Sequence, residues 1–448
     1  MSNIKEVLIK NKIIYSGWLI SKRIKTLIPI NEIKRQNLKI GTYENLYHIK
    51  DNALYKKYLV LSQKIALNQM RKNKPIKVAF QTALLQTWIG DDILKLFNSD
   101  NRFDVTVVLT WQKNTEKERE LLQLKEHFKG FDVKVRLADG TVKPKDFDII
   151  FFTTPYIEAL ENFSWKSIPL NTLVCYIPYG FLLADIQKTQ FNLFVHNIVW
   201  KNYVTAKDYV ELSEKYCDIG SHGVVYSGYP KMDAVYQGKE EYSKWKKADN
   251  IGIKKIIYAP HHSIDAKPYY STFAQNKDFI LECAKKYADE TSWIFKPHPL
   301  LGLSAVKSGL FRNEKEYLEY VDSWNSLPNA TVVEGDYLSL MASSDAMIMD
   351  SVSFMCEYLY FHKPMLFLER NKGGVNEFGE KIKDVLYQVS GDDFDGIRDF
   401  IENTIDNDFM KTVRERVYEK ELDYYTYNKM LAAEFIYSDI CKGVFSDE

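Results

Sequence analysis

The chain has 448 residues, 46% of them apolar and 14% aromatic, which is roughly two to three times the length of one domain and enough apolar surface for at least two cores. Its 60 Lys and Arg residues balance its 60 Asp and Glu residues, so the overall charge argues against a strongly basic protein with a nucleic-acid partner. Five cysteines, odd in number and without a CxxC pair, predict neither a zinc cluster nor a disulfide framework.

The amino-terminal segment, residues 1–75, carries 16 Lys and Arg residues against 4 Asp and Glu residues, a charge near +12. Lys10, Lys12 and Lys22 interrupt its apolar residues, so neither a signal peptide nor a membrane-spanning helix is predicted. A helix lying on an anionic membrane and a helical extension packed on the main body both fit this composition. We expect a basic amphipathic extension on a cytoplasmic protein that is peripheral on the cytoplasmic face of the cell membrane.

After residue 75, short β-branched runs alternate with longer segments that carry apolar residues at helical spacing, as in residues 93–97. The predicted strands cover residues 76–80, 103–110, 131–137, 147–152 and 173–178. This alternation is typical of a parallel sheet with crossover helices. We place a first α/β domain at residues 76–245.

A charged stretch poor in β-branched residues follows at 236–252, and the alternation then restarts, with a helix predicted at 278–290. Five further strands are predicted at residues 255–260, 292–297, 330–334, 346–350 and 365–368. A second domain at 246–448 therefore faces the first across a cleft. Its last helix, about 409–439, is expected to cross back onto the first domain.

Ligands of open parallel sheets bind outside the carboxyl ends of the strands, so the segments that follow each predicted strand carry most functional weight. These segments are residues 176–180, 228–233, 259–263, 296–299, 334–336 and 350–354. No Ser-His-Asp order, HExxH, Walker loop or GxGxxG motif accompanies them.

Lys296 and His298 lie in a Lys-Pro-His-Pro segment whose prolines restrict the backbone. His298 can donate a hydrogen bond to a phosphate oxygen or take part in proton transfer, because its reference pKa lies near neutrality. A purely structural histidine is the alternative. His261 and His262 follow the preceding strand, and because they are adjacent, one is expected to face away from the cleft.

Ser351 and Ser353 begin a predicted helix, where free backbone N–H groups and the helix dipole favour a phosphate; an ordinary N-cap is the alternative. Glu357 on that helix can complement the dipole or bind the two hydroxyls of a ribose. Asp350 ends a very apolar strand and either orients the serine loop or caps the helix.

Several of these motifs together resemble one family, the CDP-glycerol glycerophosphotransferases, which are the teichoic-acid primases and polymerases of bacterial cell walls. The motifs that carry the resemblance are Gly-Tyr-Pro-Lys-Met-Asp (228–233), Tyr-Ala-Pro (258–260), Lys-Pro-His-Pro (296–299), Ser-Asp-Ala-Met-Ile-Met-Asp-Ser-Val-Ser-Phe (344–354), Glu-Tyr-Leu (357–359) and Lys-Pro-Met-Leu-Phe (363–367). The resemblance covers about residues 76–440. It implies the GT-B fold, with two Rossmann-like domains and the donor bound mainly by the second.

The resemblance also implies roles for single residues. The residues that would bind the donor are His298, Lys296, Ser351, Ser353 and Glu357, with Pro260, His261, His262 and Ser263 lining the same cleft. Tyr179 stands where the family usually has a histidine as candidate base, and Gly180 and Tyr229 would lie on the acceptor side. A phenol is a poor base at its ordinary pKa. His298, Tyr179 and Asp350 are the candidate catalytic residues.

The implied reaction transfers glycerol phosphate, or a similar polyol phosphate, from a CDP-linked donor to a hydroxyl of a cell-surface glycan or lipid-linked acceptor, and it releases CMP. Asp345 and Asp350 lie at opposite ends of one strand, so no metal and no cofactor are predicted. A nucleotide-activated donor, such an acceptor and the anionic inner membrane surface are the expected partners. The alternatives are a GT-B glycosyltransferase that uses a nucleotide sugar for surface polysaccharide synthesis and a catalytically silent nucleotide-binding module.

Overall fold

The computed structural model describes residues 41–72, 75–111, 117–160, 162–238, 244–247, 250–265, 267, 269–335, 337–370 and 374–445. The first 40 residues of the predicted basic extension therefore lie outside the described residues. Residues 41–72 of that extension form helices α4 (Tyr43–Tyr47) and α5 (Asn52–Met70), whose buried side chains join the core of the first sheet. This part of the predicted extension is thus integral to the first α/β unit.

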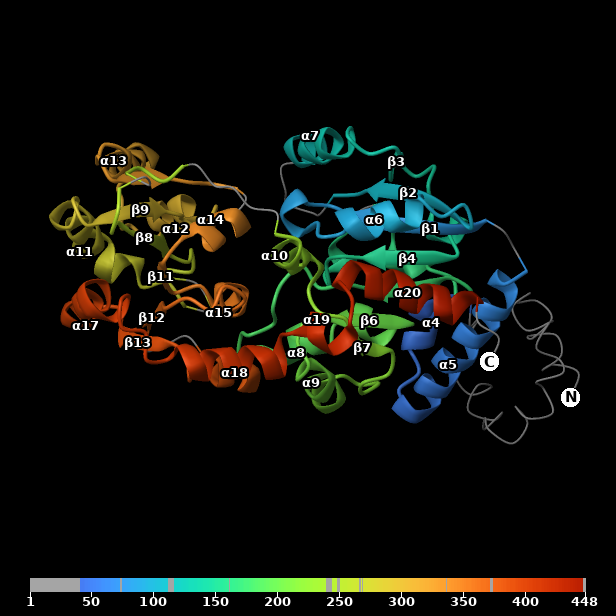
Figure 1. Ribbon diagram of the computed structural model, residues 1–448. Helices are drawn as coiled ribbons and strands as arrows, with labels where there is room; N and C mark the ends of the chain where they lie inside the picture. The colour runs from blue at the N-terminus through green and yellow to red at the C-terminus, as the bar shows by residue number, and fades with distance from the viewer. Residues whose placement is uncertain are drawn as a thin grey trace, which may run out of the picture. The chain divides into compact units, whose positions relative to one another are not determined.

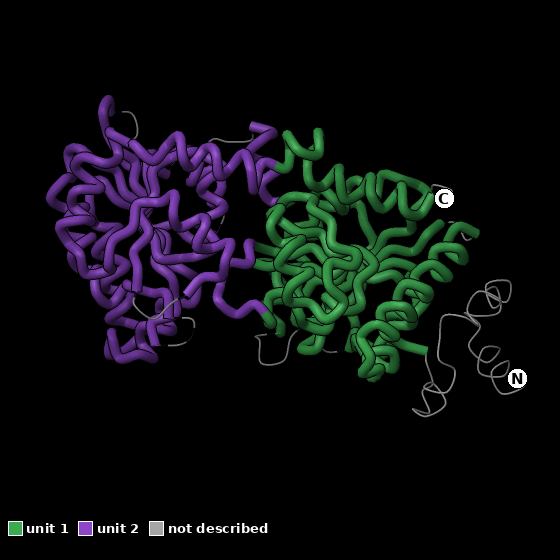
Figure 2. The backbone as a smooth tube through the Cα atoms, turned by 90° about the horizontal axis from the view of Figure 1, so that it is seen from below, with its two compact units in different colours: residues 1–180, 188–230, 424–448 green, residues 181–187, 231–423 purple. Residues whose placement is uncertain are grey.

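The chain divides into two compact units, shown in green and purple in Figure 2. Unit 1 contains residues 1–180, 188–230 and 424–448, and unit 2 contains residues 181–187 and 231–423. The main transition therefore lies at 230/231 instead of the predicted 245/246. Residues 424–445 belong to unit 1, so the described chain returns to its first unit after unit 2.

Unit 1 is built on a parallel sheet with the strand order β3-β2-β1-β4-β5-β6-β7. Its strands are β1 (Ile76–Thr82), β2 (Phe103–Leu109), β3 (Lys134–Leu137), β4 (Ile149–Phe152), β5 (Leu173–Tyr176), β6 (Lys201–Val204) and β7 (Val224–Tyr226). Alternate side chains of β1 enter two cores, with Val78 and Phe80 on one face of the sheet and Ala79 on the other. Helices therefore cover both faces, as expected for a parallel sheet.

Unit 2 has a second parallel sheet with the order β10-β9-β8-β11-β12-β13. Its strands are β8 (Lys254–Ala259), β9 (Thr291–Phe295), β10 (Ala330–Val332), β11 (Ala346–Met349), β12 (Met365–Glu369) and β13 (Tyr387–Ser390). The prediction of two parallel α/β sheets is confirmed (Figure 1). Three short strands, β6, β7 and β13, were not among the predicted ones.

The remaining α-helices connect and cover these strands. In unit 1 they are α6 (Asp91–Asn98), α7 (Lys117–Phe128), α8 (Gln187–Phe191), α9 (Tyr209–Tyr216), α19 (Tyr424–Asn428) and α20 (Ala432–Phe445). In unit 2 they are α10 (Asp233–Tyr236), α11 (Phe273–Lys286), α12 (Leu301–Lys307), α13 (Glu314–Asn325), α14 (Leu338–Ser343), α15 (Val352–Leu359), α16 (Glu377–Lys383), α17 (Phe394–Asp399) and α18 (Lys411–Glu421). The predicted long carboxyl-terminal helix is therefore three helices, α18, α19 and α20.

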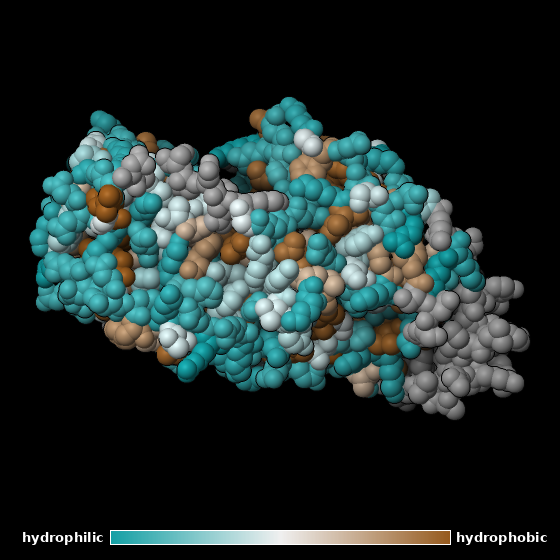
Figure 3. Space-filling view, in the orientation of Figure 1, coloured by the Kyte–Doolittle hydropathy of each residue, from teal (hydrophilic) through white to brown (hydrophobic). Residues whose placement is uncertain are grey.

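On the face seen in Figure 3, the described surface is mostly hydrophilic, and its apolar side chains gather in small groups. Among the described helices, none combines the length and the apolar composition that a membrane span requires.

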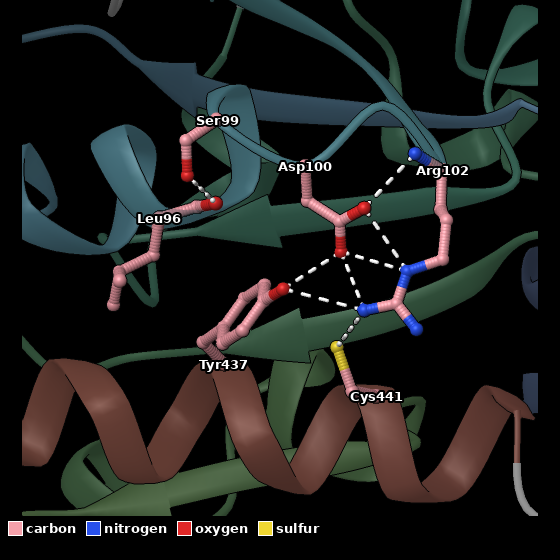
Figure 4. Close-up of polar contacts among 6 residues, drawn as sticks. All are labelled: Leu96, Ser99, Asp100, Arg102, Tyr437 and Cys441. Carbon is pink, nitrogen blue, oxygen red and sulfur yellow. Dashed lines mark hydrogen bonds and ion pairs between the residues drawn. The ribbon is translucent and has the colours of Figure 1, made fainter.

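Helix α20 is fastened to unit 1 by a small polar network (Figure 4). Arg102 Nη2 lies 2.6 Å from Asp100 Oδ2, and the Tyr437 hydroxyl donates to the same oxygen at 2.7 Å. These bonds lower the pKa of Asp100 to about 2, the contribution of Arg102 being the largest. The Arg102 guanidinium also lies 4.4 Å from the centre of the Phe445 ring. The network ties the end of the chain to the loop between α6 and β2.

Substituting Tyr437→Phe should remove one hydrogen bond to an ionised carboxylate and loosen α20 by about 1 kcal/mol, which corresponds to about fivefold faster amide exchange in that helix. The effect should shrink as the pH falls from about 4 toward 2, because Asp100 gains its proton there. Hydrogen exchange followed by mass spectrometry measures both. Tyr427→Phe, at an exposed tyrosine of unit 1, is the matched control. Equal exchange in the two variants at neutral pH would contradict this role.

Candidate functional site

The register of the second sheet brings three loop segments together. Ala259 at the end of β8 pairs with Met349 on β11, and Tyr258 pairs with Phe295 on β9. The residues that follow these three neighbouring strands are therefore adjacent at one edge of the sheet, which is the edge where open α/β folds bind ligands. They include most of the residues that the sequence singled out.

Three histidines form a cluster at this edge. The ring centres of His262 and His298 are 4.1 Å apart, those of His261 and His262 are 4.3 Å apart, and those of His261 and His298 are 5.3 Å apart. The expectation that one of the two adjacent histidines faces away is wrong. Both side chains pack beside His298, because the chain bends at His262 after β8 instead of continuing as an extended strand, in which adjacent side chains would point to opposite sides.

Backbone hydrogen bonds fix the tautomers of two of these rings. The Leu300 N–H donates to Nδ1 of His298 at 3.1 Å, and the Ser263 N–H donates to Nδ1 of His261 at 3.2 Å. A neutral imidazole that accepts at Nδ1 carries its proton on Nε2. His261 and His298 thus present N–H donors at their other ends.

Burial keeps these rings uncharged. It lowers the pKa of His261 to about 2, and neighbouring His262 and His298 add to the shift. Burial also lowers the pKa of His298 to about 4, with His262 and Lys296 contributing. Two neutral N–H donors beside the Lys296 ammonium suit an anion.

The same cluster is compact enough for a metal ion, since one ligand atom from each histidine lies within 4.8 Å of the others. A metal needs the lone pair of the ligating nitrogen, so the proton must sit on the other nitrogen of the ring. In His261 and His298 that other nitrogen already accepts a backbone N–H. The hydrogen bonds thus favour an anion over a metal, and the absence of a metal requirement stays a prediction.

Asp350 organises the loops around the histidines. Its side chain is 1% exposed, and one oxygen accepts the His261 N–H at 2.5 Å, while the other accepts the N–H of Thr272 at 2.5 Å and its hydroxyl at 2.9 Å. Burial raises the pKa of Asp350 to about 6 although these bonds oppose the shift. Both oxygens are used by the protein, a geometry that suits a positioning role. The catalytic role of Asp350 stays a prediction.

Glu357 lies on α15, and its carboxyl group is 2% exposed. One of its oxygens, Oε2, is buried and has no hydrogen-bond partner among the described residues. Burial raises the pKa of Glu357, opposed by the positive charges of Lys231 and Lys296 and by a hydrogen bond from Tyr337. A buried acceptor without a donor is costly, so this oxygen is prepared for a hydroxyl from outside the protein.

The other predicted donor-side residues divide into two groups. Ser351 is the N-cap residue of α15, yet its hydroxyl makes no capping hydrogen bond, and Ser353 lies on the first turn of that helix. Ser263 is buried, and its hydroxyl accepts the Tyr270 N–H at 2.9 Å, while the Pro260 carbonyl accepts the His298 N–H at 3.2 Å. The first pair is available to a ligand, whereas the geometry of the second pair shapes the loop.

The predicted acceptor-side residues lie in unit 1, after β5 and β7. The buried Tyr229 donates its hydroxyl to the Tyr179 carbonyl at 2.5 Å, and Gly180 follows in the same segment. The Tyr179 side chain is 36% exposed. Desolvation and the neighbouring Tyr156 hydroxyl raise the pKa of Tyr179 to about 12, so this phenol stays protonated at neutral pH. This agrees with the expectation that a phenol is a poor base, and a catalytic role for Tyr179 stays a prediction.

Sequence reasoning missed three residues of this region. Thr272 bonds Asp350 from a loop with no recognisable motif. Lys231 and Tyr337 meet near Glu357, with the Lys231 ammonium 3.9 Å from the centre of the Tyr337 ring. Lys231 stands within the Gly-Tyr-Pro-Lys-Met-Asp motif, so the motif carried a signal for it, whereas Tyr337 had none.

Known proteins resemble this chain in sequence and in fold. The model of the family described as CDP-Glycerol:Poly(glycerophosphate) glycerophosphotransferase matches residues 165–428. A variant of the wall teichoic acid polymerase TagF is 13% identical, covers 93% of this chain and 98% of its own, and superposes with a TM-score of 0.53. The UDP-GlcNAc 2-epimerase of Neisseria meningitidis is 17% identical, with 82% and 99% covered and a TM-score of 0.53.

These two likenesses show the fold, which is GT-B. Among curated proteins, the UPF0215 protein MJ1150 of Methanocaldococcus jannaschii is 25% identical over 155 residues, 34% of this chain and 82% of that protein.

Substituting Asp350→Asn should place an amide N–H against a backbone N–H donor and release the His261 loop. We expect about 1–3 kcal/mol of lost stability and about tenfold weaker binding of inorganic pyrophosphate. Calorimetric titration and thermal unfolding measure these effects. Asp345→Asn is the matched control, because Asp345 accepts the Lys255 N–H at the other end of the same strand. Equal pyrophosphate affinity in the two variants would argue against the positioning role.

Proposed function

The chain belongs to the CDP-glycerol:poly(glycerophosphate) glycerophosphotransferase family, and we propose that it transfers glycerol phosphate, or a similar polyol phosphate, from a CDP-linked donor to a hydroxyl of a cell-surface glycan or lipid-linked acceptor. CMP is the second product. The family match establishes a transferase of this type. The donor and the acceptor are the proposed part.

The single observation that carries the proposal is the pair of fixed Nε2–H donors on His261 and His298 beside the Lys296 ammonium. A pyrophosphate offers oxygens to such donors and gains from the nearby positive charge. The hydroxyls of Ser351 and Ser353 at the start of α15 supply further donors. Together these groups would hold the donor by its two phosphates.

Glu357 supports the assignment of a nucleotide. Its buried, unpartnered Oε2 needs a hydrogen-bond donor, and a ribose hydroxyl is a group that can supply one. A ligand that fills both places must carry a sugar hydroxyl and a phosphate on one molecule. A nucleoside diphosphate derivative meets that requirement.

In the proposed reaction the acceptor hydroxyl oxygen forms a bond to the β-phosphorus of the donor, and the bond from that phosphorus to the bridging oxygen breaks. The electron pair stays on the phosphate of CMP. The charge that develops on the phosphate oxygens would be stabilised by Lys296 and the imidazole N–H groups. The protein contributes mainly positioning and charge.

We expect cytidine nucleotides to stabilise the protein against heat, with CDP-glycerol or CDP-ribitol giving larger shifts than CMP and UDP-sugars giving none. At 100 times its dissociation constant a ligand adds about 2.7 kcal/mol. Glu357→Gln replaces one acceptor oxygen by an NH₂ group and should reduce the shift for every cytidine nucleotide, but not for inorganic pyrophosphate. Thermal stabilisation by UDP-sugars alone would change the assignment to glycosyl transfer. If no nucleotide stabilised the protein, the assignment would change to a catalytically silent module.

Donor binding should take up protons. A pyrophosphate beside the three histidines opposes the burial that lowers the pKa of His262, and this ring can take a proton without losing a bond to the backbone. The bound state therefore holds more protons than the free state, and affinity should rise as the pH falls from 8 toward 6. Calorimetry in buffers of different ionisation enthalpy counts those protons. The transfer is proposed to need no metal, so EDTA should leave the titration unchanged. Proton release on binding, or a loss in EDTA restored by a divalent ion, would contradict the anion site.

The proposed place of the protein is the cytoplasmic face of the membrane, reached through residues 1–40, which hold nine Lys and Arg residues against two Asp and Glu residues. Because α4 and α5 belong to unit 1, the suitable truncation begins at residue 41. Flotation with vesicles of anionic lipid should retain the full chain and lose the chain 41–448. Equal flotation of both proteins would contradict this role.

A further inference from the structure

We propose that His262 is the general base that accepts the proton of the acceptor hydroxyl. The inference rests on the proposed function, because it assigns the proton that the transfer releases. His262 differs from His261 and His298 in the hydrogen bonds of its ring nitrogens.

His262 is the one histidine of the cluster whose tautomer no hydrogen bond fixes. His261 and His298 accept backbone N–H groups at Nδ1 and so keep a proton on Nε2. Neither ring nitrogen of His262 has a hydrogen-bond partner among the described residues. Its Nδ1 is buried, whereas its Nε2 is not fully buried. Only this ring can offer a lone pair at Nε2 without breaking a bond to the backbone.

The position of His262 suits this task. Its ring centre is 4.1 Å from that of His298, so a phosphate bound by the Nε2–H of His298 lies beside His262. A hydroxyl that attacks this phosphorus must approach the same spot. The hydroxyl oxygen bonds to phosphorus, its proton passes to Nε2 of His262, and CMP leaves with the electron pair of the broken P–O bond.

Burial, rather than a neighbouring charge, keeps His262 uncharged in the free protein. Burial lowers the pKa of His262, and the titratable or charged groups near it are His261 on its own loop, His298 and Lys296 after β9, and Asp350 after β11. Asp350 has both oxygens bonded to protein, which excludes it as the acceptor of the proton. Tyr179 is held as a neutral phenol by its pKa of about 12.

The test compares His262→Gln with His48→Gln, a matched change at an exposed histidine of unit 1. CMP release from CDP-glycerol is followed with glycerol as a soluble hydroxyl acceptor, and donor affinity is measured separately by calorimetry. His262→Gln should lower kcat by about 10²–10⁴-fold and remove the acid limb of the pH profile, with donor affinity nearly unchanged. His262→Ala should regain turnover when imidazole is added, which a fold defect would not allow.

The outcomes separate this inference from the proposed function. Donor binding that fails in the unsubstituted protein contradicts the proposed function and the inference with it. If His262→Gln binds the donor normally and keeps an unchanged kcat, only the inference is overturned. The same holds if His262→Gln loses donor affinity but keeps its kcat at saturating donor. ¹⁵N spectra of the protein with labelled histidine report the protonation and the tautomer of each ring without any turnover. As the pH falls, His262 should be the first of the three rings to gain a proton. A His262 ring fixed as the Nε2–H tautomer would overturn the role of base.

Discussion

The buried carboxylate of Asp350 is the interaction on which the donor side of the protein depends. It lies just past β11 and bonds the loop after β8 and the segment before α11 at the same time. A carboxylate that is removed from water needs such donors, because an unpaired buried charge is strongly unfavourable. The loops supply the donors that Asp350 needs, and in turn these hydrogen bonds hold the loops in place. The orientation of His261 follows directly from it.

A second feature of this edge of the sheet is its electrostatics. The edge of the sheet holds three imidazoles that burial keeps neutral, and the permanent positive charge comes from Lys296 and from Lys231 near Glu357. Neutral N–H donors can bind a phosphate without repelling one another, whereas three imidazolium groups at this spacing could not remain buried. The site can therefore be assembled in the free protein and gain positive charge only when an anion arrives. Such an arrangement is prepared before the ligand binds.

Much of the fold was predictable from sequence, because buried parallel strands appear as β-branched runs, and ten of the thirteen observed strands overlap predicted ones. The prediction failed where the pattern is short. Strands β6 and β7 have four and three residues, and the residues of β13 alternate between half-buried and exposed. The predicted long final helix is broken at Lys429, whose φ of 59° is incompatible with a helix.

The sequence named candidate residues that the fold brings to one edge of the second sheet, but it did not show their contacts. Motifs identified His298, Ser351 and Glu357, whereas the meeting of His261, His262 and His298 depends on β8 lying between β9 and β11. Strand order in a parallel sheet is a property of the whole chain and not of any local segment. For the same reason Thr272 could not be found, since its partner lies 78 residues away.

The most direct test of the account is ³¹P nuclear magnetic resonance of a reaction of the purified protein with CDP-glycerol and a synthetic acceptor that ends in a glycerol hydroxyl. We predict that the pyrophosphate signals of the donor disappear while CMP and a new phosphodiester appear in equal amounts. An unchanged donor, together with turnover of a UDP-sugar in a parallel sample, would contradict the assignment of this chain as a glycerophosphate transferase.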